Sequence, residues 1–108
     1  MKRFEIDYLP GAIEFLESID AKAAEKLVYN ISKSQVVNDS RLFKKLKNSN
    51  IWEFRAENNS NEYRLFAFWD KTRNAFVICT HGIAKKTQKT PVKEIDKAEH
   101  LRKKYLGL

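Results

Sequence analysis

Hydrophobic and polar residues alternate along three segments in the middle of the chain, and this pattern predicts three β-strands. The segments span residues 51–56, 62–70 and 75–82 and are rich in aromatic and β-branched side chains. Residues 58–61 and 71–74 separate them and have compositions typical of turns. Because short connections join antiparallel neighbours, the three strands are expected to form a meander.

The register of the strands decides which side chains of this meander lie together. A turn centred between residues 59 and 60 would place Arg55 opposite Arg64, and a turn centred between residues 72 and 73 would place Arg64 opposite His81. The three side chains would then form a row on one face of the sheet. The other face is expected to be core and to contain Trp52, Phe54, Leu65, Ala67, Phe76 and Ile78.

The remaining segments predict one more strand and three helices. Residues 2–8 alternate like a short strand, and residues 10–20 and 21–34 repeat hydrophobic positions with a helical period. Pro91 can begin a last helix that ends near Tyr105. The order of strand, two helices, three-strand meander and C-terminal helix predicts an α+β fold with a small antiparallel sheet. All 108 residues are expected to form a single domain.

Charge is distributed unevenly along the chain, which carries a net charge of +7. Residues 1–40 have five basic and seven acidic side chains, whereas residues 41–108 have sixteen basic and seven acidic ones. This asymmetry favours a polyanionic partner, with nucleic acid the leading candidate, although a solvated lysine surface would give the same pattern.

Composition also limits the environment of the protein. A single cysteine excludes an intramolecular disulfide. No apolar run is long enough to span a membrane, and the N-terminus lacks the apolar core of a signal peptide. We therefore expect a cytoplasmic protein without a membrane partner.

The predicted row of Arg55, Arg64 and His81 is the main candidate for chemistry. Guanidinium groups match phosphate oxygens in bidentate fashion, and a histidine beside two fixed positive charges should have a lowered pKa and be able to accept a proton. Two arginines directly opposite each other repel and contribute nothing structural. The alternative is a surface ion-pair network in which Glu53 and Glu62 neutralise them.

A lysine-rich loop follows the third strand of the meander. Lys85, Lys86 and Lys89 could follow a sugar–phosphate backbone, with Gln88 as an uncharged hydrogen-bonding neighbour. Two histidines are too few for a metal site with ordinary spacing, and the chain has no glycine-rich phosphate loop. No metal and no cofactor are expected.

Several motifs of the chain resemble the RelE/ParE superfamily of bacterial toxins, specifically its HigB-like, phage-derived branch. The motifs cover roughly residues 40–105, and the one that begins at His81 is the most distinctive. They read FKKL at 43–46, IWEFR at 51–55, YRLF at 63–66 and HGIAKKTQKTP at 81–91, followed by Glu94, Ile95 and Ala98.

The resemblance implies a RelE-like fold and the toxin of a type II toxin–antitoxin module that cleaves mRNA in the ribosomal A site without a metal. Arg55 and Arg64 would clamp the scissile phosphate, and His81, from its expected place beside them, is the candidate general base. Lys85 or Lys86 would stabilise the pentacoordinate phosphate or protonate the leaving oxygen. The remaining predicted RNA contacts, to ribosomal RNA, are Lys44, Lys45, Lys47, Gln88 and Lys89.

The same resemblance implies a cognate helix-turn-helix antitoxin, through which alone the protein would contact operator DNA. Two other functions share the fold. One is a ParE-like inhibitor of DNA gyrase without nuclease activity, and the other is a degenerate toxin whose remaining role is operator binding with its antitoxin.

Overall fold

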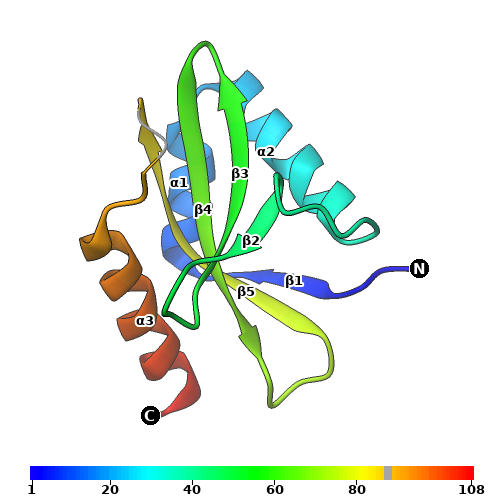
Figure 1. Cartoon of the computed structure of the whole chain (residues 1–108), viewed down its shortest axis with the longest axis vertical. Helices are drawn as coiled ribbons and strands as arrows, with labels where there is room; N and C mark the ends of the chain where they lie inside the picture. The colour runs from blue at the N-terminus through cyan, green and yellow to red at the C-terminus, as the bar shows by residue number, and fades with distance from the viewer. Residues whose placement is uncertain (87–88) are drawn as a thin grey trace.

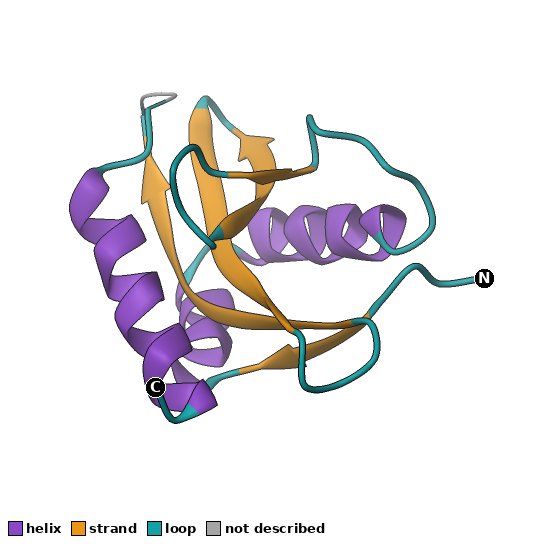
Figure 2. Ribbon diagram, turned by 60° about the horizontal axis from the view of Figure 1, so that its bottom comes forward, coloured by secondary structure: helices purple, strands orange, loops and turns teal. Residues whose placement is uncertain are grey.

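A computed structural model describes residues 1–86 and 89–108 and shows one twisted sheet with helices on both faces (Figures 1 and 2). The strand order is β1-β5-β4-β3-β2. The elements in chain order are β1 (Glu5–Tyr8), α1 (Pro10–Ser18), α2 (Ala21–Ser34), β2 (Phe43–Lys45), β3 (Trp52–Asn58), β4 (Asn61–Asp70), β5 (Phe76–Lys85) and α3 (Val92–Leu106). The predicted α+β fold and meander are confirmed.

The sheet is mixed rather than wholly antiparallel. Strand β1 pairs with β5 in parallel, whereas the other neighbouring strands are antiparallel. No hairpin turn joins β1 to β5, so the meander pattern could not fix its direction. Strand β2 was not predicted, and it forms because Phe43 anchors the segment by stacking on Phe54, with ring centroids 4.2 Å apart.

Two hydrophobic clusters lie on opposite faces of the sheet. Helices α1 and α2 cover the first, where Ala12, Leu27 and Ile31 pack against β-strand residues such as Phe54 and Leu65. Helix α3 covers only part of the other face, and the second cluster comprises Leu46, Ile51, Phe66, Phe68, Ile78 and Ala98. The end of the sheet that carries the β3–β4 turn extends beyond α3 (Figure 1).

The predicted register of β3 and β4 is confirmed. Arg55 pairs with Arg64, and the turn between the strands contains two residues, Asn59 and Ser60. Both have positive φ, of 49° and 66° respectively. Positive φ at both central positions is the geometry of a type I′ turn, which matches the twist of the two strands.

The predicted register of β4 and β5 is wrong. The loop between them contains one residue more than a symmetric four-residue turn, and Ala75 at its end has a φ of 53°. Phe68 therefore pairs with Ile78 instead of Val77. This shift moves Phe76 and Ile78 off the predicted core face, and Val77 and Cys79 replace them in the first cluster.

A bulge in β5 then adds a second shift. Leu65 pairs with Gly82 and Ala67 with Cys79, so two residues of β5 lie opposite Phe66. Beyond the bulge, Arg64 pairs with Ile83 and not with His81. The two shifts together amount to two residues, so His81 keeps the predicted face of the sheet but not the predicted position on it.

Candidate functional site

Acidic and basic side chains alternate on the end of the sheet that α3 leaves uncovered. Their shared face follows from the pairing of neighbouring strands, because every second residue of a strand points to the same side. We call this set the charged cluster. It consists of Glu53, Arg55 and Glu57 of β3, Glu62 and Arg64 of β4, and Lys85 of β5.

Arg64 is the buried centre of the charged cluster, with only 1% of the residue exposed. Its Nη1 lies 2.8 Å from Oε1 of Glu62, and its Nε lies 3.4 Å from Oε2 of Glu53. Both carboxylates hold the guanidinium, so this geometry does not support the predicted direct grip of Arg64 on a phosphate. For this arginine, the predicted ion-pair network describes the structure.

Arg55 is the accessible arginine of the charged cluster, with 22% of its side chain exposed. Its Nε lies 3.5 Å from Oε2 of Glu53, the same oxygen that faces Arg64. The Thr90 hydroxyl donates a hydrogen bond of 2.9 Å to Oε1 of Glu53. Glu53 therefore positions both guanidinium groups while remaining buried.

Glu57 and Glu62 lie directly opposite each other, two residues along each strand from the pair of Arg55 and Arg64. A hydrogen bond to the Glu62 carboxyl and the negative charge of that group raise the pKa of Glu57. Opposed like charges destabilise a strand pair, and protonation of Glu57 would relieve this contact. Glu57 is exposed to solvent.

Lys85 completes the charged cluster from β5, where it pairs with Glu62. Its Nζ donates to Oγ1 of Thr90 at 3.4 Å. Partial burial, followed by the positive charge of Arg64, lowers the pKa of Lys85. A lysine with a lowered pKa gives up its proton more readily than a solvated one.

The other predicted lysines lie around the charged cluster or away from it. Lys44 is exposed and pairs with Glu53, which places it on the face of the charged cluster. Lys86 and Lys89 are exposed in the loop after β5, and Lys47 is exposed after β2. Lys45 pairs with Trp52 and belongs to the opposite face. Gln88 lies outside the described residues.

A hollow of about 370 Å³ opens beside the charged cluster, between β3 and α2. Its walls include Lys26, Asn30 and Arg41, which were not predicted because only the packing of α2 and of the loop before β2 brings them to this edge. Asn30 donates to the carbonyl of Arg55 at 2.9 Å, and Lys26 donates to the carbonyl of Glu57. The space is large enough for a small ligand. Its other walls are Leu42, Arg55, Ala56, Glu57, Glu62 and Arg64.

His81 does not belong to the charged cluster. Its Nδ1 lies 3.0 Å from the Thr80 hydroxyl, its Nε2 lies 3.1 Å from Oε1 of Glu94, and its ring packs against Phe66 at 4.9 Å between centroids. Only 5% of the residue is exposed. The pKa of His81 is lowered as predicted, but burial is the main cause rather than the arginines. His81 ties β5 to α3, and its predicted place beside the arginines is wrong.

Comparison with known proteins assigns the family. The family model described as "Phage derived protein Gp49-like (DUF891)" matches residues 14–103. The chain belongs to the Gp49-like family. None of the curated proteins matches the chain.

The Gp49-like protein has a RelE-like fold. A chain of the structure titled "Crystal structure of the intact E. coli RelBE toxin-antitoxin complex" superposes with a TM-score of 0.56. The match covers 80% of this chain and 99% of the other, with 14% sequence identity. At this identity the likeness concerns the fold, and the charged cluster has to be interpreted from its own geometry.

Neither a candidate metal site nor a membrane-spanning helix occurs among the described residues of the Gp49-like protein. They contain no group of three or more His, Cys, Asp or Glu side chains arranged to hold a metal ion. Among the described helices, none combines the length and the apolar character needed to cross a membrane.

Acidification is expected to destabilise the Gp49-like protein partly through His81. Burial holds the pKa of His81 below its usual value of 6.5, although the hydrogen bond to Glu94 acts in the opposite direction. The folded state therefore binds fewer protons than the unfolded state. The resulting stabilisation is fully present above about pH 6.5 and is lost as pH falls through the lowered pKa.

Urea unfolding at several pH values tests this expectation. His81→Gln should flatten the decline of the free energy of unfolding below about pH 6.5. His100→Gln, at an exposed histidine outside the contact between β5 and α3, is the matched control. An unchanged slope in the His81 variant would contradict the assignment.

Proposed function

We propose that this Gp49-like protein is the toxin of a type II toxin–antitoxin module and acts as a ribosome-dependent mRNA endonuclease of the HigB-like kind. The family and the RelE-like fold support the toxin class, since the similar structure is titled as a toxin–antitoxin complex. The observation that carries the nuclease activity is the charged cluster. An accessible arginine, Arg55, and a carboxyl with a raised pKa, Glu57, line one hollow. Lys85, whose pKa is lowered, lies on the neighbouring strand, paired with Glu62 of the same hollow.

The scissile phosphate would lie against Arg55 and the lysines at the end of β5. Arg55 lines the hollow, and Glu53 fixes its guanidinium group. Lys86 is exposed next to Lys85 and would add a second cationic contact. Arg64 acts as a positioning residue, because it is buried and holds Glu53 and Glu62 in place. Cations fixed in this way stabilise negative charge that develops on a phosphate in the transition state.

The cleavage step needs one proton acceptor and one proton donor. The 2′-hydroxyl attacks the adjacent phosphorus, a 2′,3′-cyclic phosphate forms, and the bond to the 5′ oxygen breaks. Glu57 in its ionised form would take the proton of the 2′-hydroxyl, and Lys85 would give a proton to the leaving 5′ oxygen. The pKa of Glu57 is raised and the pKa of Lys85 is lowered. Both shifts favour proton transfer near neutral pH.

The partners follow from the same proposal. A cognate helix-turn-helix antitoxin would bind the toxin and would provide its only contact with operator DNA. On the ribosome, the substrate is mRNA in the A site, and the exposed lysines would contact ribosomal RNA through its phosphates. These are Lys44, Lys45, Lys47 and Lys89. The site of action is the cytoplasm, and the mechanism uses no metal or cofactor.

Mapping the 5′ ends of transcripts after brief induction tests the proposal. New ends are expected inside translated codons and should disappear when translation initiation is blocked before induction. Co-expression of the antitoxin should remove them as well. Ends that form equally in untranslated RNA would overturn ribosome dependence, and the absence of new ends during growth arrest would overturn the nuclease assignment.

Inhibition of DNA gyrase by a ParE-like mechanism is the second candidate. The observation in its favour is that the three carboxyl groups of the charged cluster balance its three basic groups. Such a balance is typical of a structural ion-pair network, and a protein with that network in place of a catalytic site would act by binding alone. A pulse of labelled precursors separates the two candidates. A nuclease stops protein synthesis first, whereas a gyrase inhibitor stops DNA replication first.

A further inference from the structure

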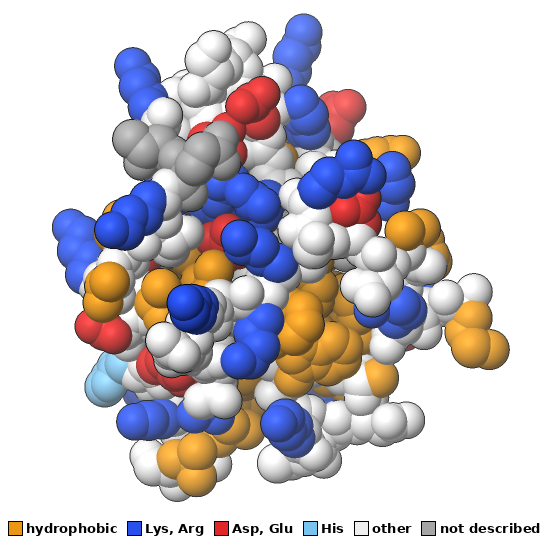
Figure 3. Space-filling view, in the orientation of Figure 1, with side chains coloured by type: hydrophobic (Ala, Val, Ile, Leu, Met, Phe, Trp, Pro, Cys, Tyr) orange, Lys and Arg blue, Asp and Glu red, His pale blue; other side chains and the backbone are white. Residues whose placement is uncertain are grey.

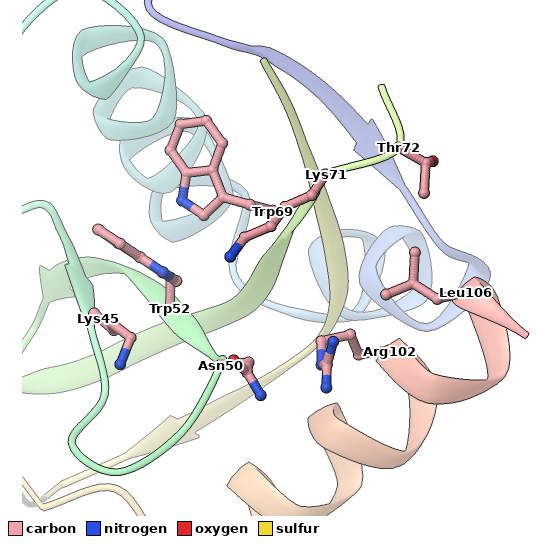
Figure 4. Close-up of a pocket in the computed structure, with 8 residues that line it drawn as sticks. All are labelled: Lys45, Asn50, Trp52, Trp69, Lys71, Thr72, Arg102 and Leu106. Carbon is pink, nitrogen blue, oxygen red and sulfur yellow. The ribbon is translucent and has the colours of Figure 1, made fainter. Parts of the chain in front are cut away.

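A second hollow, of about 160 Å³, lies at the other end of the sheet, where β3 begins and β4 ends. Because the pairing of β3 with β4 starts at Trp52 and Ala67, residues 68–70 of β4 extend past the first residue of β3. The two tryptophans of the sequence both line this hollow (Figure 4). We call it the tryptophan pocket, and its walls are Lys45, Asn50, Trp52, Trp69, Lys71, Thr72, Arg102 and Leu106.

The two indoles of the tryptophan pocket are held rigidly and remain partly exposed. Their ring centroids are 6.1 Å apart in an edge-to-face arrangement. Phe43 stacks beneath Trp52 at 4.8 Å, and Phe4 packs edge-on against Trp69 at 5.3 Å. Both tryptophans are only half-buried. The pocket therefore offers preformed aromatic surface, which reduces the entropy lost when a flat ring binds.

The charge around the tryptophan pocket is positive. Three of its walls are cationic, namely Lys45, Lys71 and Arg102, and no acidic residue lines it. Lys45 and Lys71 are exposed, whereas Glu99 orients Arg102 from outside the pocket through a contact of 2.8 Å. On the face shown in Figure 3, Lys and Arg side chains surround an apolar area near the centre of the molecule. An aromatic floor with a cationic rim matches a nucleotide, whose base is flat and whose phosphates are anionic.

We propose that the tryptophan pocket binds one unpaired base of single-stranded RNA, stacked on an indole, while Lys45 and Lys71 hold the phosphates on either side. The volume sets the limit of one ring system, because a cavity of about 150 Å³ accommodates benzene. The choice of RNA as the ligand rests on the proposed function. The pocket lies at the opposite end of β4 from the charged cluster, and its Trp52 belongs to the other face of the sheet.

Intrinsic fluorescence tests the pocket directly, because every tryptophan of the protein lines it. The ligand is a short single-stranded RNA with 2′-O-methyl groups, which cannot undergo attack by the 2′ oxygen. Stacking of a base should quench the emission, whereas inorganic polyphosphate, which has charge but no base, should not. Equal quenching by both ligands, or no quenching by the RNA, would overturn the proposal.

Variants separate the base from the phosphates. Lys71→Gln is at an exposed position and should weaken RNA binding without unfolding the protein. Trp69→Phe keeps a smaller ring in the core and should weaken binding by less than the roughly five- to hundredfold that complete loss of one stacked base costs. Lys22→Gln, on α2, removes the same charge at an exposed position and is the control. Unchanged affinity in both pocket variants would overturn the assignment.

The same experiment distinguishes this inference from the proposed function. If the protein cleaves translated mRNA but the RNA ligand does not quench its emission, only the tryptophan pocket is refuted. If the ligand quenches the emission but no transcript is cleaved after induction, the pocket is supported and the nuclease assignment is refuted.

Discussion

Replacement of Arg64 by methionine is expected to lower the free energy of unfolding by about 3–5 kcal/mol, the range found when one partner of a buried ion pair is removed. Arg64 is 1% exposed and faces Glu53 and Glu62, which are themselves 1% and 6% exposed. The variant would leave two carboxylates in the sheet without their main counter-charge. Equilibrium unfolding in urea gives the difference directly.

A second substitution shows whether the loss comes from unpaired charge. Glu53→Gln combined with Arg64→Met neutralises one of the two carboxylates that lose Arg64, and the double variant should be more stable than the sum of the two single variants predicts. Arg41→Met breaks an exposed ion pair with Asp39 and should not measurably change stability. If Arg64→Met unfolds at the same urea concentration as the parent protein, the guanidinium is not buried as described.

This expectation changes how loss of toxicity should be interpreted. A variant of Arg64 that no longer arrests growth would not identify a phosphate ligand, because partial unfolding would give the same result. Only the accessible members of the charged cluster, such as Arg55 and Lys85, can be tested by activity alone.

The pairing of Arg55 with Arg64 could be predicted from the sequence because a short turn joins their strands. Two residues with positive φ join β3 to β4, so counting outward from Asn59 and Ser60 places Arg55 opposite Arg64. The register of β5 could not be obtained in this way. Its loop ends on Ala75 in a left-handed conformation, and a bulge beside Phe66 adds another residue, and neither feature has a distinctive local sequence.

The alternation of hydrophobic and polar residues also did not reveal that Arg64 is buried. Alternation places Arg64 on a face that is polar at this end, and a polar face suggests exposure. The residue is buried because Glu53 and Glu62 enclose it and Thr90, far away in the sequence, covers Glu53. Long-range contacts of this kind decide whether an arginine contacts a ligand or holds other side chains in place.

Neutral replacements of Arg55 and Lys85 are expected to reduce mRNA cleavage by about 10²–10³-fold each, the effect of removing one preorganised donor from a transition state. Arg55→Gln removes the accessible guanidinium, and Lys85→Gln removes the proposed proton donor. Both side chains lie nearer the surface than Arg64, so the fold should survive. Cleavage of a defined mRNA on purified ribosomes gives the rates, and Lys22→Gln is the matched control.

The dependence of the cleavage rate on pH distinguishes the two roles. A proton donor acts only when protonated, so the rate should fall as pH rises through the pKa of Lys85, which lies below the usual 10.5. Lys85→Arg keeps the charge but stays protonated throughout this range, and it should abolish that decline together with most of the activity. Arg55→Lys should retain the decline, because its role is to hold the phosphate. If the decline persists in Lys85→Arg, the donor is another group, and Lys85 contributes only its charge.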